Sequence, residues 1–154
     1  MNPTEIYNTY QQLREKLLAE RNAEGYWTGR LSASALATAV AIVALKVDQK
    51  PQDQLHIDTG FNWLIRHINA DGGFGDSPES LSNVSTTLLS YAAIRFCQHH
   101  SEGEAALQAM EGWLEKQGIP LQSGSITRSI LNFYGRDYTF SIPILSMLVV
   151  CGVL

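Results

Sequence analysis

The sequence predicts an all-α fold of stacked helical hairpins, and three observations lead to this prediction. Nearly every segment has apolar residues three or four positions apart, which is the helical period. A helix with a polar face is followed repeatedly by a glycine-containing loop and then by a more apolar helix. The pattern recurs, since Trp27 and Phe74 are 47 residues apart and Leu64 and Leu114 are 50 residues apart. This repeat indicates an outer and an inner helical layer in a closed barrel or an open solenoid, with an irregular bundle as the alternative.

The first predicted hairpin covers residues 4–47. Its first helix, residues 4–21, begins after Pro3 and has an apolar face. Residues 32–47 are rich in alanine and almost free of charge, so they predict a helix that is covered on most sides. The length and alanine content of this segment favour a helix over a strand.

The second and third hairpins cover residues 54–97 and 103–135. The turn-forming sequence DGGFGDSPES separates the two helices of the second hairpin, and Gly135 is the predicted C-cap of the third. An apolar segment, residues 139–154, follows and is short for a transmembrane helix. The chain of 154 residues suits one hydrophobic core, so residues 1–154 are predicted to form a single domain.

Composition excludes several classes of protein. Apolar residues make up 45% of the chain and charged residues 17%, which is typical of a globular protein. The net charge is −4 and no basic stripe is present, so nucleic acid is not expected as a partner. Cys97 and Cys151 lie in apolar runs and predict buried free thiols in a reducing compartment. The polar N-terminus lacks the apolar core of a signal peptide, which favours a cytoplasmic location.

No cofactor, metal site or catalytic residue is predicted. Asp71 and Asp76 flank the second glycine loop and could suggest calcium, but their spacing favours turn formation. The four histidines have no cysteine at the spacing of zinc ligands. Four serines near predicted helix starts are interpreted as helix caps and not as nucleophiles. These histidines and serines are His56, His67, His99, His100, Ser32, Ser34, Ser82 and Ser85.

Three stretches share a motif of leucine or tryptophan-leucine followed by glycine, and the first two end in an aromatic ring. They read LLAERNAEGYW (17–27), GFNWLIRHINADGGF (60–74) and GWLEKQG (112–118). This motif resembles the QW repeats of the triterpene cyclases, the squalene–hopene and oxidosqualene cyclases. The positions that correspond to the repeat are Asn22, Gly25, Trp27, Trp63, Gly73, Phe74, Trp113, Gln117 and Gly118. The resemblance implies that these residues are structural.

The match covers nearly the whole chain, with departures at the glutamine positions. Segments 81–96 and 126–143 also resemble helices of the same cyclases. Asn22 stands where the first repeat should have glutamine, and Ile68 stands there in the second repeat. The third repeat has a short spacer and no closing ring. In the family the glutamine ties neighbouring hairpins together, so the tie is expected to be lost at Ile68.

The resemblance implies an α/α toroid of the terpenoid cyclase and prenyltransferase superfamily, and an activity in polyprenoid cyclisation. The family protonates an alkene with an Asp-x-Asp-Asp cluster, and no such cluster occurs in this sequence. The chain is therefore expected to be an N-terminal fragment or truncated homologue of a cyclase, inactive alone. The alternative is a non-catalytic helical-repeat module that binds a protein partner or an isoprenoid lipid.

The expected partners follow from the same resemblance. A squalene-like isoprenoid would be the substrate in the full-length context. Three hairpins do not close a toroid, so the open edge could pair with a second copy in a homodimer. The segment 139–154 could lie against the inner face of the membrane as a peripheral contact, although a buried core helix is favoured there.

Overall fold

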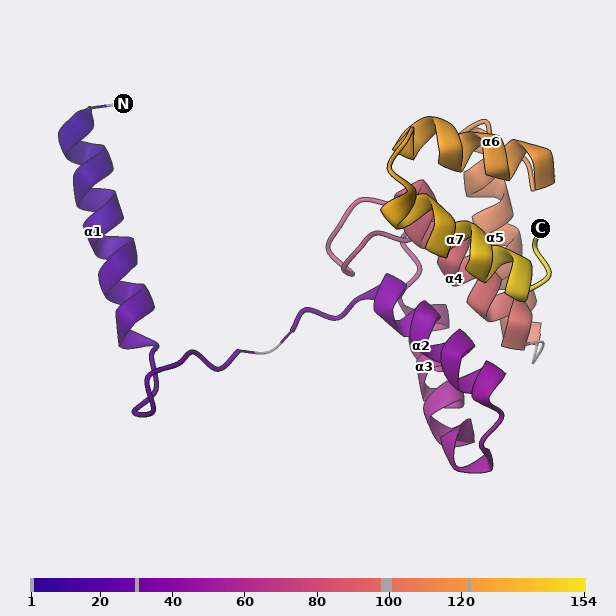
Figure 1. Cartoon of the computed structure of the whole chain (residues 1–154), viewed down its shortest axis with the longest axis horizontal. Coiled ribbons are helices and arrows are strands. Elements are labelled where there is room, and N and C mark those ends of the chain that lie inside the picture. Colours follow the sequence, from indigo (N-terminus) through magenta and orange to yellow (C-terminus); the bar gives the residue numbers. More distant parts are fainter. Residues whose placement is uncertain (1, 30, 98–100, 122) are drawn as a thin grey trace. The chain divides into compact units, whose positions relative to one another are not determined.

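The structure is a computed structural model that describes residues 2–29, 31–97, 101–121 and 123–154. Within these ranges the chain is entirely helical and contains no strand (Figure 1). The elements are α1 (Pro3–Ala19), α2 (Ala35–Asp48), the short 3-10 helix η1 (Pro51–Asp53), α3 (Gln54–Arg66), α4 (Val84–Cys97), α5 (Ser101–Lys116), α6 (Ser123–Tyr134) and α7 (Tyr138–Val150). The predicted all-α fold of helical hairpins is confirmed.

The chain divides into two compact units, Met1–Ser32 and Ala33–Leu154. The first contains α1 and the loop that follows it, and the second contains α2 to α7. The predicted division into three hairpins stays a prediction, as does the single domain, because α1 and α2 belong to different units.

The start of α1 is well specified by its sequence. Asn2 accepts a hydrogen bond from the Thr4 amide at 3.1 Å, and the Glu5 carboxylate accepts one from the Asn2 amide at 3.3 Å. This reciprocal pair is a capping box, and Pro3 occupies the first helical position. No residue of α1 is buried, so the apolar face that its sequence predicts has no packing partner within the first unit.

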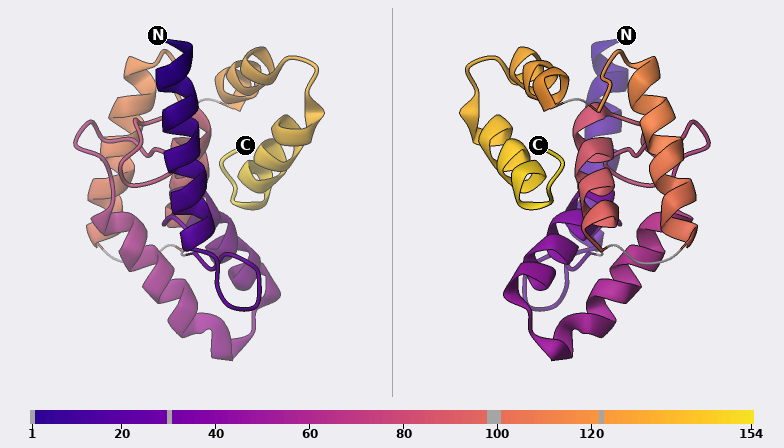
Figure 2. Two further views of the ribbon diagram at one scale, coloured as in Figure 1. Left: turned by 90° about the vertical axis from the view of Figure 1, so that its left-hand side faces the viewer. Right: turned by 90° about the vertical axis from the view of Figure 1, so that its right-hand side faces the viewer.

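Helix α4 is the central helix of the second unit. It packs against α2, α3, α5 and α7, and Figure 2 shows it between α5 on one side and α7 on the other. Every residue from Thr86 to Ile94 is buried, which explains why this helix has hardly any polar face. The outer helix α3 is amphipathic and buries Ile57, Phe61 and Leu64.

The caps of the second unit agree with the turn chemistry of the sequence. Ser34 caps α2 by accepting from the Ala37 amide at 3.2 Å. Helix α6 ends at Tyr134, where Gly135 has a φ of +58° and donates to the Leu131 carbonyl at 2.8 Å. This conformation suits glycine, so the predicted C-cap is confirmed.

The apolar C-terminal segment forms α7. Asp137 caps it by accepting from the Thr139 amide at 3.0 Å, and Ser141, Ile144 and Leu148 are buried on one side. Helix α7 also exposes large apolar side chains, namely Tyr138, Phe140, Ile142, Val149 and Val150, of which Tyr138, Ile142 and Val149 share one side by their spacing. In the described part of the chain, no helix is long and apolar enough to cross a membrane.

Candidate functional site

The second glycine loop, residues 68–76, contains one position, Gly72, that only glycine suits. The Asn69 amide donates to the Gly73 carbonyl at 3.0 Å, and the Gly72 amide donates to the Asn69 carbonyl at 2.9 Å. Gly72 has a φ of +92°, and a Cβ at this position would lie 2.7 Å from the carbonyl oxygen of Ala109 in α5. Gly72 is therefore required both by its conformation and by the close approach of α5.

The aromatic residue of this loop anchors the start of α4. Phe74 is 1% exposed, and its amide donates to the Thr87 hydroxyl oxygen at 2.9 Å. Its carbonyl accepts from the Asn83 amide at 2.9 Å. The loop and the first turn of α4 are thus joined by backbone hydrogen bonds as well as by burial of the ring.

Asp71 joins three segments of the second unit through one carboxylate. Its Oδ1 accepts from the Gly73 amide at 3.0 Å and from the Ser82 hydroxyl at 2.7 Å. Its Oδ2 accepts from the indole nitrogen of Trp113, in α5, at 3.0 Å. Desolvation acts to raise the pKa of Asp71, but the hydrogen bonds from Ser82, Gly73 and Trp113 outweigh it and lower this pKa.

The first glycine loop, residues 21–29, repeats this backbone in the first unit. The Asn22 amide donates to the Tyr26 carbonyl and the Gly25 amide to the Asn22 carbonyl, both at 3.0 Å. Gly25 has a φ of +92°, as Gly72 does. The Trp27 indole donates to the Leu17 carbonyl at 2.5 Å, so the ring folds back over the end of α1.

The third repeat ends in a different turn. Trp113 is buried, and Gly118 follows α5 with a φ of +74°. The amides of Gly118 and Ile119 donate to Glu115 and Leu114, which closes the helix end. Gln117 is exposed, and within the described residues its side chain makes no hydrogen bond.

The geometry corrects the alignment of the second repeat. His67 follows Trp63 as Gln117 follows Trp113, and its ring stacks on Trp63 with the ring centroids 4.1 Å apart. Asn69 makes the backbone hydrogen bonds that Asn22 makes in the first loop. Asn69, one residue after Ile68, thus has the place in the second loop that Asn22 has in the first, so Asn22 and Ile68 are not equivalent in the structure. The side-chain amide of Asn69 donates to the Ser80 carbonyl and the Ser82 hydroxyl, which lie in the same connection between α3 and α4.

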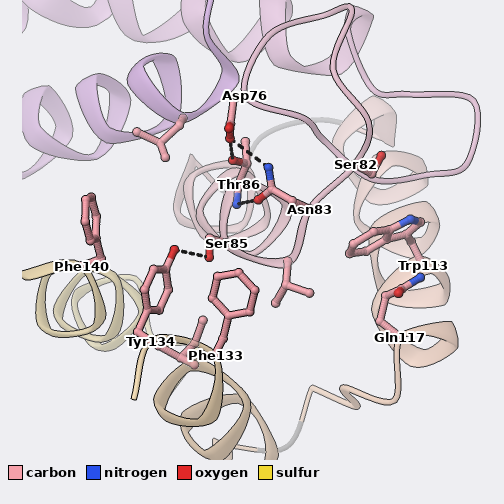
Figure 3. Close-up of a pocket in the computed structure, with 13 residues that line it drawn as sticks. Asp76, Ser82, Asn83, Ser85, Thr86, Trp113, Gln117, Phe133, Tyr134 and Phe140 are labelled. Carbon is pink, nitrogen blue, oxygen red and sulfur yellow. Dashed lines mark hydrogen bonds between the residues drawn. The ribbon is translucent and has the colours of Figure 1, made fainter. Parts of the chain in front are cut away.

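A cavity of about 570 Å³ opens beside the second glycine loop, at the N-terminal end of α4 (Figure 3). Four aromatic residues from three helices line it, namely Trp113, Phe133, Tyr134 and Phe140. Its size falls in the range of small-molecule sites, and its lining combines aromatic rings with a few polar groups, as such sites do.

Three hydrogen bonds hold the wall that α4 contributes to this cavity. Oδ1 of Asp76 accepts from the side-chain nitrogen Nδ2 of Asn83 at 2.9 Å and from the Thr86 hydroxyl at 2.7 Å. The Ser85 hydroxyl and the Tyr134 hydroxyl are 2.8 Å apart, which connects α4 with α6. The cavity is therefore built from residues far apart in the sequence.

The family assignment agrees with this architecture. A family described as the squalene-hopene cyclase N-terminal domain matches residues 10–149. The chain belongs to this family. A "Probable squalene--hopene cyclase" of Sinorhizobium fredii is 24% identical over 150 residues, which cover 97% of this chain and 23% of the relative. The chain thus spans about a quarter of the length of that relative. No solved structure matches the present chain.

The structure of this squalene–hopene cyclase N-terminal domain brings together part of the predicted repeat set. Gly73 and Trp113 approach each other, since a Cβ on Gly73 would lie 2.9 Å from the indole of Trp113. Phe74 lies under the start of α4, whereas Asn22, Gly25 and Trp27 form their loop in the first unit. The structural role of the whole set stays a prediction.

Sequence reasoning missed the carboxylate that takes the place of the glutamine tie. Asp71 was interpreted as a turn former, and its bond to the Gly73 amide confirms that role. Its bond to Trp113 spans 42 residues and has no local signal. Three of the four predicted serine caps are also wrong. Ser34, and not Ser32, caps α2. Asn83 caps α4, while Ser82 donates to Asp71 and Ser85 pairs with Tyr134.

The thiols and histidines are placed as follows. Cys97 and Cys151 are buried and free, as predicted, and burial raises the pKa of both, that of Cys151 to about 11. Within the described ranges, no group of three or more histidine, cysteine or acidic residues could hold a metal ion. His99 and His100 lie outside the described residues.

Proposed function

We propose that this chain is the N-terminal part of a squalene–hopene-cyclase-like protein that cyclises polyprenoids, and that it does not catalyse cyclisation by itself. The family match and the 23% coverage of the relative support the first statement. The second rests on the chemistry of the acid. An alkene is a very weak base, so its protonation needs a strong, correctly placed acid.

The observation that carries this proposal is the state of the two aspartates in the second glycine loop, Asp71 and Asp76. Asp71 accepts hydrogen bonds through both oxygens, and its lowered pKa keeps it ionised, the reverse of what a proton donor needs. Asp76 accepts two hydrogen bonds from protein groups at the edge of the cavity. The sequence contains no Asp-x-Asp-Asp cluster.

The direct test is incubation of the purified chain with squalene, followed by gas chromatography and mass spectrometry of the extract. A full-length squalene–hopene cyclase serves as the positive control. We expect no cyclic triterpene above the protein-free blank. A cyclic product from the chain alone would contradict the absence of an acid.

A genomic test addresses the fragment interpretation. An in-frame continuation after Leu154 that encodes an Asp-x-Asp-Asp cluster supports the cyclase proposal. A stop codon directly after Leu154 would contradict it and favour the second candidate. That candidate is a helical-repeat module whose cavity of about 570 Å³ binds an isoprenoid lipid or a segment of a protein partner.

The apolar side of α7 supports two partner proposals. Tyr138, Ile142 and Val149 recur at helical spacing on this side and are 58%, 57% and 59% exposed. Neighbouring exposed apolar side chains of this kind often mark an interaction surface. We propose that this side pairs with a second copy or lies on the inner face of the cytoplasmic membrane. Light scattering after size exclusion tests the dimer, and a monomer would contradict it. Flotation with liposomes tests the membrane contact, and protein left at the bottom of the gradient would contradict it.

A further inference from the structure

The cavity beside α4 carries an unbalanced negative charge. Among the described residues that line the cavity, Asp76 is the only acidic one, and none is lysine, arginine or histidine. The two groups that donate to Asp76 are the side-chain amide of Asn83 and the hydroxyl of Thr86, and both are neutral. The N-terminus of α4 offers about half a positive charge at most. A net negative potential therefore remains at this end of the cavity.

One oxygen of Asp76 is available to a ligand. Both hydrogen bonds are accepted by Oδ1, and among the described residues Oδ2 accepts none. Figure 3 shows the carboxylate at the rim of the cavity, held by Thr86 and Asn83. These contacts fix the position of the carboxylate without neutralising it.

Aromatic rings form the rest of the wall. Phe133 and Tyr134 meet edge to face at 4.9 Å, and Tyr134 stacks with Phe140 at 5.8 Å. Phe133 is 78% exposed and Phe140 is 57% exposed, so their ring surfaces are not used by the core. Trp113 lies on the opposite side of the cavity from Phe140 (Figure 3). Aromatic faces attract cations, and this attraction adds to that of the carboxylate.

We propose that this cavity binds an organic cation with an apolar body, that is, an alkyl-substituted ammonium group. The rings accept the alkyl part and the ammonium face, and Asp76 supplies the counter-charge. An anionic ligand of the same shape is repelled by Asp76, and a phosphate finds no basic side chain in the lining. A neutral ligand gains only the burial of its apolar surface. This binding activity goes beyond the proposed function and does not depend on it.

The test compares three ligands that share a ten-carbon alkyl group, namely decyltrimethylammonium, decanol and decanoate. Each is used below its critical micelle concentration. Binding is measured by titration calorimetry on the full chain. We expect the ammonium compound to bind about tenfold more tightly than the alcohol, and the carboxylate to bind most weakly. Equal affinities, no binding of the ammonium compound, or a preference for decanoate would overturn the proposal.

Two substitutions locate the preference. Asp76→Asn removes the charge but keeps an oxygen that can accept from Thr86 and Asn83. It should therefore lower the affinity for the ammonium compound about tenfold and leave the affinity for the alcohol unchanged. Asp58→Asn is the matched control, because Asp58 is an exposed aspartate on α3 outside the cavity and its loss changes the net charge equally. Equal effects of the two substitutions would overturn the proposal.

A third substitution keeps the test decisive if Asp76→Asn prevents folding. Phe133→Leu replaces an exposed ring with an apolar side chain of similar reach, so folding is not expected to suffer. This substitution should reduce the affinity for the ammonium compound severalfold more than the affinity for the alcohol, because only the cation uses the ring face. A parallel loss for both ligands would contradict the role of the ring.

Discussion

The two glycine loops have nearly the same sequence and the same backbone but very different surroundings. Gly25 and Gly72 share a φ of +92°, and Asn22 and Asn69 make the same pair of backbone hydrogen bonds. Yet Trp27 is 48% exposed whereas Phe74 is 1% exposed. The comparison teaches that a short local motif specifies the turn, while the helices around the second loop decide what the turn stabilises.

The acidic residue of each loop shows the same contrast. Glu24 and Asp71 stand at equivalent positions, two residues after the asparagine. The Glu24 backbone amide donates to the Asn22 side chain within the loop. The Asp71 carboxylate instead reaches Trp113 in α5 and Ser82 before α4. The four predictions that follow test this difference, from the largest expected effect to the smallest.

The largest effect is expected from removing the two rings. Phe74→Ala should lower the free energy of unfolding by about 3–5 kcal/mol, because it leaves a cavity in the core under α4. Trp27→Ala should cost about 1 kcal/mol or less, because half of this ring is already in water. Urea unfolding followed by far-UV circular dichroism measures both. Equal losses would show that the first loop is as tightly packed as the second.

The next effect separates conformational strain from collision. Gly72→Ala should lower the free energy of unfolding by about 3 kcal/mol. Its positive φ is unfavourable for alanine, and the new Cβ would also collide with the Ala109 carbonyl. Gly118→Ala is the matched control, since φ is +74° there and nothing lies within 4 Å of the new Cβ. Strain alone should cost about 1–2 kcal/mol at Gly118. The same urea experiment compares the two variants, and a Gly118 loss as large as that of Gly72 would contradict a specific contact with α5.

A smaller effect is expected from the carboxylate tie. Asp71→Asn retains one acceptor oxygen but places an amide group where Oδ2 accepts from Trp113. Because Asp71 is exposed, we expect a loss of about 1 kcal/mol. Glu24→Gln in the first loop is the control and should change stability by less than about 0.5 kcal/mol. Thermal unfolding of the two variants checks the ranking, and a larger loss at Glu24 would reverse the comparison.

The smallest effect is a dependence on pH. The pKa of Asp71 is lower in the folded chain than the value of about 3.9 expected when unfolded, so the unfolded state binds the proton first as pH falls. The contribution of Asp71 is therefore fully present above about pH 5 and is lost as pH falls through the folded pKa. The difference in free energy of unfolding between the native chain and Asp71→Asn should stay constant down to about pH 5 and shrink as pH falls further. A gap that widens on acidification would contradict the tie.

Much of the fold could be predicted because its signals are local. Helical periodicity placed α2, α3 and α7 within a few residues of their observed bounds, and Gly135 marked the end of α6. These signals depend on side-chain spacing and on backbone conformation, which neighbouring residues determine. The repeat motif was local in the same sense and indicated the family that the comparison then showed.

The site could not be predicted in the same way. The Asp71–Trp113 and Ser85–Tyr134 contacts join residues 42 and 49 positions apart, and no spacing rule connects them. The backbone hydrogen bonds also show that Asn69 makes in the second loop the contacts that Asn22 makes in the first. The cavity needs residues from α4, α5, α6 and α7 at once.

The sequence by itself determined the helices, the turns and the family, because caps, glycine conformations and apolar periodicity act over a few residues. The tertiary structure alone decided which of two equal loops became an anchor and where a charge meets aromatic rings. Burial and hydrogen bonding across helices depend on packing, and packing is set by the whole of the second unit.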